Sequence, residues 1–418
     1  FNRFRHTMPF ISASPPPCSE EEGEAYAPEA IYHLAGGRLF FTTHSARERT
    51  ARLIADHPDI FFFSSNEPES YEPFCADHGP VDISSVTNLC RQVRDFMEHP
   101  LLQKRHLVFY TSTDPAHVSN AALLLSCYLV LELGYTPEQA SSRFDRIMGL
   151  PIVRFRDATW QEPTFTLSIL DCLCGLRRAT QLGWFDHRTF DVAYRERICE
   201  REEHDICRVT PGLVAFATPN TQVDTHHPFR RTVEAHAGPF GDLGVTDVVR
   251  LSRGGVYYCD EHLAKGTGVK HHAIEFADGT APPLELVERF LGICDAAEGA
   301  VSVHCVAGLG RTGTLIGCHM IRRSGFTARE AIGWLRLCRP GSVIGPQQQF
   351  LEEYQERFGE RGGEGDMGRA GTAQSDTGSA ECWNGTYPCA AASAAAARHM
   401  VKDNAQGLEQ GTKRVIPG

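Results

Sequence analysis

The sequence predicts an α/β protein of two tandem domains, each a mainly parallel sheet flanked by helices, joined by a long linker helix. Strand-like apolar runs alternate with helical patterns over residues 31–160 and again over 211–357. The two stretches also repeat each other at a constant offset of 191 residues (127 to 318), since 126–136 resembles 317–327. In both segments a Cys is followed by a Gly, an aromatic residue and a Thr. A duplicated unit explains this match; the alternative is two unrelated amphipathic helices that look alike.

The elements of the first unit follow from the period of its apolar residues. Short apolar runs predict strands, whereas apolar residues spaced three and four apart predict helices. The predicted strands are 38–43, 60–64 and 107–110, and the predicted helices are 81–98, 119–133 and 137–144. A further amphipathic helix is predicted over 164–182, before a charged segment at 186–204. We therefore assign 161–210 to linker helices.

The second unit starts with the apolar run 211–216 and ends near residue 357. Its predicted strands include 248–251 and 299–303, and its predicted helices include 283–297 and 312–321. Strands and helices alternate, which favours parallel pairing within this unit as well.

Both ends of the chain differ from these units in composition. Residues 1–30 contain three consecutive prolines and three consecutive glutamates, which predicts a flexible arm. Residues 358–418 are rich in Gly, Ala, Ser and Gln and poor in large apolar residues, so we predict a disordered tail. The first residue is Phe1 rather than Met, and we expect the natural chain to extend further.

The overall composition argues against several classes of function. The net charge of −11 disfavours a general nucleic-acid or acidic-membrane binder. No apolar run is long enough to span a bilayer, so membrane insertion is not expected. The 15 cysteines form neither a disulfide framework nor a zinc spacing, which favours a reducing, intracellular compartment. We expect neither a metal nor a cofactor.

The most informative segment is 304–312, which reads His-Cys-Val-Ala-Gly-Leu-Gly-Arg-Thr. It joins a predicted strand to a predicted helix, where free backbone N–H groups and the positive end of the helix dipole converge on an anion. A thiol in such a place is readily deprotonated and becomes a nucleophile. The planar fork of an Arg matches two phosphoryl oxygens, which Lys cannot do. The segment is therefore predicted to bind phosphate through Arg311 and to attack it through Cys305.

The other residues of the segment have predicted supporting roles. The phosphate-binding loop is completed by Val306, Ala307, Gly308, Leu309, Gly310 and Thr312. The glycines let the backbone curl so that its amides point inward, and the hydroxyl of Thr312 can stabilise the thiolate when it leaves phosphorus. His304 is expected to hydrogen-bond to the backbone and fix the loop. The alternative is that Cys305 is an ordinary buried cysteine, but the surrounding motif argues against it.

Asp278 is the candidate general acid. One predicted helix and a return strand separate it from Cys305, so its loop can reach the phosphate. Gly279 and two following prolines suit a loop that closes over substrate. The predicted chemistry has two steps: thiolate attack while Asp278 donates a proton, then attack by water on the phosphocysteine while Asp278 accepts one. The alternative is a plain turn or helix-capping aspartate.

The repeat predicts an equivalent loop in the first unit, at 111–120. This loop contains no Cys, no Arg and no internal Gly. The first unit is therefore predicted to keep the architecture without the chemistry, and to wall the cleft and help bind substrate.

Taken together, these motifs resemble the Cdc-fourteen family of dual-specificity protein phosphatases, which act in the cell cycle. The resemblance covers about residues 30–357. The residues that carry it are 73–80, 155–158, 276–279, 303–314 and 338–348. The last of these reads Cys-Arg-Pro-Gly-Ser-Val-Ile-Gly-Pro-Gln-Gln and is very specific.

The resemblance implies two tandem protein-tyrosine-phosphatase-like domains, a non-catalytic one at 31–160 and a catalytic one at 211–357. It implies that Cys305 is the nucleophile, Arg311 the phosphate ligand and Asp278 the acid. It places Gln347 or Gln348 near the site, where either could orient the hydrolytic water, with a plain helix-start role as the alternative. It also implies a role in mitotic exit, in nucleus and cytoplasm and at structures such as the spindle or centrosome.

The family prefers phosphoserine followed by proline, with a basic residue further on that an acidic groove along the linker takes up. Glu196 and Asp205 match two positions of that groove, and Glu200 lies nearby, but the third acidic position falls on Cys199. The alternative for these residues is a solvated charged helix. A second departure is Val306, where the family usually has Lys, so affinity for highly charged substrates should be lower.

Three hypotheses follow. The first is a protein phosphatase that acts on phosphoserine or phosphothreonine before Pro, and on phosphotyrosine, with Ser-Pro and Thr-Pro phosphoproteins as partners. The second is a phosphotyrosine or inositol-lipid phosphatase; lipid enzymes of this kind usually have two lysines in the loop, where this chain has Val306 and Leu309. The third is a phosphopeptide-binding scaffold without turnover, which the presence of Cys305 and Asp278 disfavours.

Overall fold

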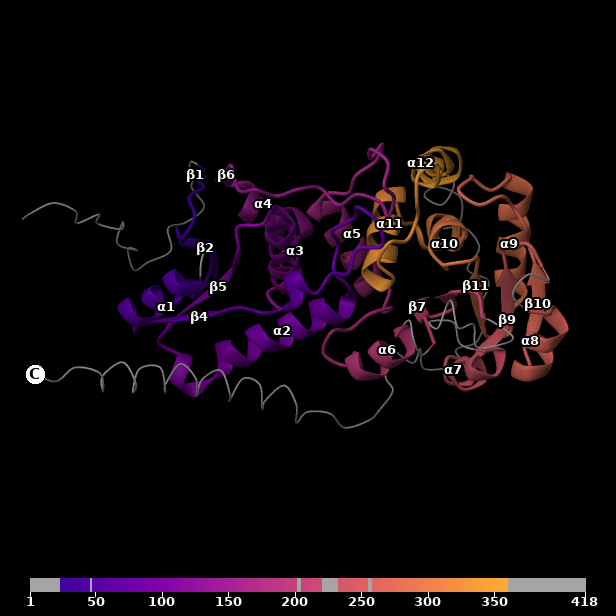
Figure 1. Ribbon diagram of the computed structural model, residues 1–418, viewed down its shortest axis with the longest axis horizontal. Coiled ribbons are helices and arrows are strands. Elements are labelled where there is room, and N and C mark those ends of the chain that lie inside the picture. The colour runs from indigo at the N-terminus through magenta and orange to yellow at the C-terminus, as the bar shows by residue number, and fades with distance from the viewer. Residues whose placement is uncertain (1–22, 46, 201–203, 220–231, 255–257, 360–418) are drawn as a thin grey trace, which may run out of the picture.

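The computed structural model describes residues 23–45, 47–200, 204–219, 232–254 and 258–359 (Figure 1). Most of the predicted arm and almost all of the predicted tail lie outside these residues. Figure 1 shows two sheets toward opposite ends of the long axis, with helices α3 (Pro115–Leu131), α5 (Ile169–Gln181) and α11 (Ala328–Cys338) between them. No helix in the described ranges combines the length and the apolar character needed to cross a membrane.

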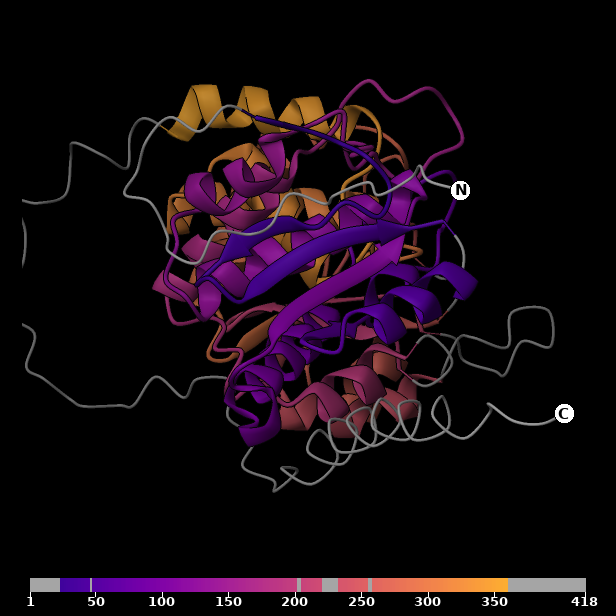
Figure 2. The same ribbon diagram turned by 90° about the vertical axis from the view of Figure 1, so that its left-hand side faces the viewer.

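The first sheet has four strands in the order β2-β3-β5-β4 (Figure 2). Strand β2 (Tyr32–Ala35) pairs antiparallel with β3 (Leu39–His44), whereas β5 (His106–Ser112) runs parallel to both β3 and β4 (Ile60–Phe63). Alternate side chains face opposite sides of the sheet. Phe40, Phe62 and Val108 pack toward helix α1 (Arg47–Asp56), and Phe41, Phe61, Phe63 and Phe109 pack into the main core with α2 (Ile83–Glu98) and α3.

The second sheet has five strands in the order β10-β9-β11-β8-β7. Strand β7 (Ile206–Thr210) is antiparallel to β8 (Leu213–Phe216), and the other neighbours are parallel. The parallel strands are β9 (Val245–Arg250), β10 (Lys270–Ala273) and β11 (Ala300–His304). The helices that follow β8 are α7 (Ala237–Asp242), α8 (Asp260–Thr267), α9 (Leu284–Ala296), α10 (Gly310–Ser324), α11 and α12 (Pro346–Phe358).

The two sheets confirm the predicted fold class, because both are mainly parallel and share one topology. Each starts with an antiparallel hairpin whose second strand lies beside the strand that leads into a central helix, β5 into α3 and β11 into α10. Each central helix is followed by a helix with a capping box. Thr136 and Gln139 begin α4 (Pro137–Asp145), and Thr327 and Glu330 begin α11. A duplicated unit explains this correspondence.

Helix α5 joins the two units through a close helix crossing. A Cβ atom added to Gly175 would lie 2.4 Å from the carbonyl oxygen of Glu330, and one added to Gly333 would lie 3.0 Å from that of Asp171. The backbones of α5 and α11 therefore approach closely because both positions lack a side chain. Apolar residues of both units merge into one core, in which Trp334 is fully buried and donates to the carbonyl of Val209 (2.8 Å).

Three predicted elements need correction. Strand β7 lies inside 161–210, for which we expected only helices; the charged residues before it obscured a short apolar alternation. The helix predicted over 164–182 begins at Ile169, because Ser168 caps it together with Asp171. The helix predicted from 119 begins at Pro115, because Asp114 caps it, so most of the predicted loop 111–120 is helical.

Candidate active site

The phosphate-binding loop lies at the carboxyl end of a central parallel strand. Strand β11 ends at His304 and α10 begins at Gly310, and β8 and β9 flank β11 on either side. Cys305 directly follows the strand and is only 3% exposed. Ligands of parallel α/β sheets bind at this edge, where loops meet helix N-termini.

Four consecutive carbonyls of the loop are held from outside. The carbonyl of Cys305 accepts from the Thr218 hydroxyl, and that of Val306 accepts from the Thr218 amide (3.0 Å). Arg339 donates to the carbonyls of Ala307 and Gly308, at 2.9 Å each. Since C=O and N–H of a trans peptide point in opposite directions, the amides that follow these carbonyls turn toward the interior of the loop. Among the described residues none accepts a hydrogen bond from the amides of 306–309, which leaves them for an anion.

Gly308 is required by this curvature. Its φ is +67°, and an added Cβ would lie 2.1 Å from the carbonyl oxygen of Phe216. No side chain fits there without moving β8, so the glycine predicted to let the loop curl has a clear steric reason.

Arg311 lies in the first turn of α10 with its guanidinium aimed at the loop carrying Asp278. The side chain is nearly buried, and Nη1 donates to the carbonyls of Leu251 (3.3 Å) and Phe276 (3.1 Å). Its Nε lies 3.0 Å from Oδ1 of Asp278 as an ion pair, without the alignment of a hydrogen bond. Nη2 makes no hydrogen bond to a described residue. A phosphate can therefore bind Nη2, and also Nε if it displaces Asp278.

Asp278 lies on the loop between β10 and α9 and is largely exposed, with 74% of its side chain accessible. Its Oδ1 also accepts from the amide of Gly279 (3.1 Å). The carboxyl therefore lies at the solvent side of Arg311, where a leaving group would depart. Thr312 is fully buried, and its hydroxyl has no hydrogen-bond partner among the described residues.

The two candidate glutamines have different surroundings, although both are fully buried. Gln347 donates to the carbonyl of Thr280 (3.2 Å), and its Oε1 lies 2.8 Å from the position of a Cβ on Gly310. It therefore lies between the phosphate-binding loop and the loop of Asp278. Gln348 instead accepts from Arg336 (2.7 Å) and donates to the carbonyl of Gly345 (3.1 Å), so its side-chain amide is bound at the start of α12.

The residues predicted for the acidic groove do not form one equivalent set. Glu196 on α6 (Val192–Cys199) and Glu200 at its end are exposed. Partial desolvation, with the negative charges of Asp82 and Glu67, raises the pKa of Glu196. The carboxylate of Asp205 lies 2.7 Å from Nη1 of Arg339 and is 21% exposed. Its charge is balanced inside the protein.

The first unit blocks its own equivalent of the loop. At the offset of the repeat, Asp114 stands in the place of Cys305 and Asn120 in that of Arg311. The Asp114 carboxylate accepts from the amides of Ala116 (2.9 Å) and His117 (3.2 Å). A carboxylate of the chain thus occupies the helix N-terminus at which a phosphate would bind.

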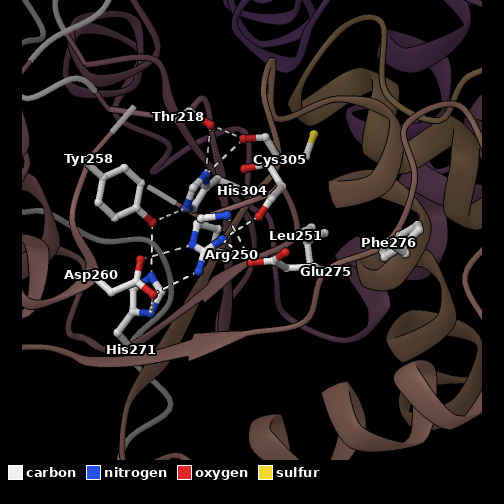
Figure 3. Close-up of polar contacts among 12 residues, drawn as sticks. Thr218, Arg250, Leu251, Tyr258, Asp260, His271, Glu275, Phe276, His304 and Cys305 are labelled. Atoms are coloured by element: carbon white, nitrogen blue, oxygen red, sulfur yellow. Dashed lines mark hydrogen bonds and ion pairs between the residues drawn. The ribbon is translucent and has the colours of Figure 1, made fainter. Parts of the chain in front are cut away.

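Sequence patterns missed several buried residues that support the loop. His304 contacts the Cys305 carbonyl as expected, but it also contacts Tyr258, which continues to His271, Asp260 and Arg250 (Figure 3). Thr218 and Arg339 were also not predicted in this role. Arg339 belongs to the specific motif 338–348, which was the one available signal; the others carry none.

Two family models match the chain. The one described as "Dual specificity protein phosphatase, N-terminal half" covers residues 33–179, and the one described as "Dual specificity phosphatase, catalytic domain" covers 248–357. The second contains the phosphate-binding loop and Asp278, and the first contains the domain that lacks them.

Curated relatives match both units together. Dual specificity protein phosphatase CDC14A of Homo sapiens is 39% identical over 321 residues, which are 76% of this chain and 52% of that protein. Dual specificity protein phosphatase CDC14C of Homo sapiens is 36% identical, over 77% of this chain and 70% of that protein. Tyrosine-protein phosphatase CDC14 of Saccharomyces cerevisiae is 34% identical, over 73% of this chain and 56% of that protein. The chain spans about half the length of CDC14A.

Proposed function

Because the chain belongs to the CDC14 family of dual specificity protein phosphatases, we propose that it hydrolyses phosphoserine and phosphothreonine before Pro, and phosphotyrosine, in proteins. The reaction passes through a phosphocysteine. The observation that carries the proposal is the loop after β11, where four carbonyls turn outward next to Cys305 and the guanidinium of Arg311 lies between this loop and Asp278.

In the first step the Cys305 thiolate attacks phosphorus. The electron pair of the breaking P–O bond goes to the leaving oxygen, which takes a proton from Asp278. The loop amides and Arg311 stabilise the equatorial oxygens. Without phosphate, Nε of Arg311 faces Asp278 at 3.0 Å. A bound phosphate competes for that nitrogen and leaves the carboxyl to the departing oxygen.

In the second step water attacks phosphorus and gives its proton to Asp278, while the S–P electron pair returns to Cys305. Gln347 is the better candidate to orient this water, since it lies against Gly310 and Thr280, whereas Gln348 is bound to Arg336. The unpartnered hydroxyl of Thr312 donates to the departing thiolate.

The preference for a basic residue in the substrate depends on the exposed carboxylates on α6 and at its end. Glu196 and Glu200 are accessible to a basic residue of the substrate, and Glu67 adds negative potential at Glu196, whereas Asp82 is paired with Arg195. Asp205 contributes little, because Arg339 balances its charge. We therefore expect a modest preference for a downstream basic residue. An intracellular location in nucleus and cytoplasm, including mitotic structures, is proposed on the family resemblance alone.

A phosphopeptide panel tests the activity. The panel varies the phosphorylated residue (Ser, Thr or Tyr), the following residue (Pro or Ala) and a downstream Lys, and phosphate release is measured. Cys305→Ser should abolish release, whereas Cys174→Ser, a half-buried cysteine of α5, should leave it unchanged. No phosphate release by the wild type, or equal release by Cys305→Ser, would refute the proposed activity. Binding without release would favour a scaffold.

The acid has its own test. Asp278→Asn should lower kcat on phosphoserine peptides by about 10² to 10⁴-fold. It should affect p-nitrophenyl phosphate less, because nitrophenolate leaves without a proton. An equal loss on both substrates would contradict the role of Asp278 as acid.

A further inference from the structure

A connected set of buried polar side chains lies behind the phosphate-binding loop (Figure 3). His304 is fully buried, with Nδ1 3.0 Å from the carbonyl oxygen of Cys305 and Nε2 2.6 Å from the hydroxyl of Tyr258. The same hydroxyl lies 3.1 Å from Nε2 of His271 on β10. The route from β10 to the backbone of the nucleophile is thus continuous.

The set also reaches the loop that carries Asp278. Nδ1 of His271 lies 3.4 Å from Oδ2 of Asp260. The Asp260 carboxylate accepts two hydrogen bonds from Arg250, one at Oδ1 (3.1 Å) and one at Oδ2 (2.9 Å). Arg250 in turn lies 2.7 Å from Glu275, shortly before Asp278 in the chain. We refer to His304, Tyr258, His271, Asp260 and Arg250 as the polar relay.

Counting donors and acceptors gives the relay a direction. Nδ1 of His304 lies near the Cys305 carbonyl, which can only accept, and 3.1 Å from the Thr218 hydroxyl, which already donates to that carbonyl. Nδ1 therefore carries the proton and Nε2 accepts. Tyr258 must then donate to Nε2, and its oxygen presents only lone pairs to His271. A neutral His271 carries one ring proton. With the proton on Nε2 the ring donates to Tyr258, and with the proton on Nδ1 it donates to Asp260. Only the doubly protonated, charged ring can donate to both.

Burial keeps His304 neutral, since it lowers the pKa of this residue to about 3. Burial also lowers the pKa of His271, while Asp260 acts in the opposite sense. The titratable and charged groups that face His271 come from four elements: Tyr258, Asp260 and Glu261 at α8, Arg250 on β9, His272 on β10 and His304 on β11.

We propose that Tyr258 and His271 are positioning residues for Cys305, because they hold His304 in the tautomer that donates to the Cys305 carbonyl. With this carbonyl held outward, the amide of Val306 stays turned toward the phosphate and the thiolate. Without the Tyr258 hydroxyl, His304 can take the other tautomer, whose Nδ1 lone pair faces the carbonyl oxygen and repels it. The inference rests on the proposed phosphatase activity.

The test measures the reactivity of the Cys305 thiolate directly, without relying on turnover of a substrate. The rate of its alkylation by iodoacetate is measured against pH, beside the pH profile of kcat/KM. Tyr258→Phe, which keeps the ring, should move the alkylation midpoint to higher pH and lower kcat/KM about tenfold, the cost of one buried hydrogen bond. His271→Asn removes the donor near Tyr258 and should act likewise. His271→Gln places an amide close to where Nε2 was and should restore the wild-type midpoint.

The control is His272→Gln, the next residue of the same strand, which removes a similar His–Asp contact (His272 to Asp247, 2.7 Å). It should not move the midpoint. If folded Tyr258→Phe and His271→Asn lower kcat/KM but keep the wild-type alkylation profile, their role is merely structural and the proposal is overturned. If Tyr258→Phe does not fold, the alkylation midpoints of His271→Asn and His271→Gln provide the test: equal midpoints in these two variants would overturn the proposal. A wild type that alkylates as expected but releases no phosphate refutes the proposed function alone.

Discussion

Nη1 of Arg339 lies 2.7 Å from the carboxylate of Asp205, and the other nitrogens of the same guanidinium hold the phosphate-binding loop. Arg339 is 6% exposed, and the Asp205 carboxylate balances its buried charge. The pair links the end of the linker segment to the carbonyls of Ala307 and Gly308. A residue predicted to line the substrate groove thus also supports the loop.

Asp205→Asn should therefore lower stability. The free energy of unfolding should fall by about 2 to 3 kcal/mol, somewhat less than for a fully buried pair, because water reaches part of Asp205. Urea unfolding measures this change. The exposed Glu196→Gln is the control and should stay within about 0.5 kcal/mol. Unchanged stability together with a raised KM for peptides with a downstream Lys would restore Asp205 to the substrate groove.

Gly308→Ala should abolish activity. The new Cβ meets the carbonyl of Phe216 and the residue must keep φ at +67°, so the loop has to open. We expect kcat/KM on a phosphotyrosine peptide to fall at least a hundredfold. Gly292→Ala on α9, where an added Cβ meets nothing within 4 Å, should keep activity and gain about 0.5 to 1 kcal/mol in stability. Equal activity in both variants would contradict the curvature argument.

Buried histidines should make the fold sensitive to acid. Burial lowers the pKa of His304 to about 3 and the pKa values of His236 and His319 to about 4. Between these values and about 6.5 the unfolded chain binds more protons than the folded chain, so stability is lost as pH falls. Each such histidine contributes about 1.4 kcal/mol per pH unit near pH 5. Urea unfolding at pH 5 and pH 6 measures the slope, which His319→Gln should reduce by one such contribution. A slope that His319→Gln leaves unchanged would contradict this origin.

Val306→Lys should widen the range of substrates. The Val306 side chain is partly exposed, and its carbonyl is already fixed by the Thr218 amide, so a longer side chain need not disturb the loop. An added cation near the phosphate contributes up to about 1 kcal/mol. KM for a multiply phosphorylated inositol should fall about fivefold at low salt and less at high salt. p-Nitrophenyl phosphate, with one phosphate, is the control substrate and should change less; an equal change in both would mean that the lysine acts on phosphate binding in general.

The sequence could predict what depends on neighbours in the chain. The loop 304–312 has its nucleophile, glycines and Arg in one short segment between a strand and a helix, so its place at the sheet edge follows from local pattern. The duplication followed from the match of 126–136 with 317–327, which share a Cys, a Gly, an aromatic residue and a Thr at the same spacing. The start of α3 was also readable, because Asp114 followed by Pro115 is a typical helix start.

The residues that support the loop could not be predicted in the same way. Tyr258 and His304 are 46 positions apart, and Asp205 and Arg339 are 134 apart. Only the folded sheet brings them together. An Asp beside arginines and glutamates in a charged segment looks exposed, and only the partner from the end of α11 shows that its charge is balanced internally.

The crossing of α5 and α11 at Gly175 and Gly333 has a consequence for how the protein can change. Neither backbone can slide along the other without meeting carbonyl groups, so the crossing fixes the register of α5 against α11. Because apolar residues of both units merge into one core around this crossing, neither unit has a complete core without the other.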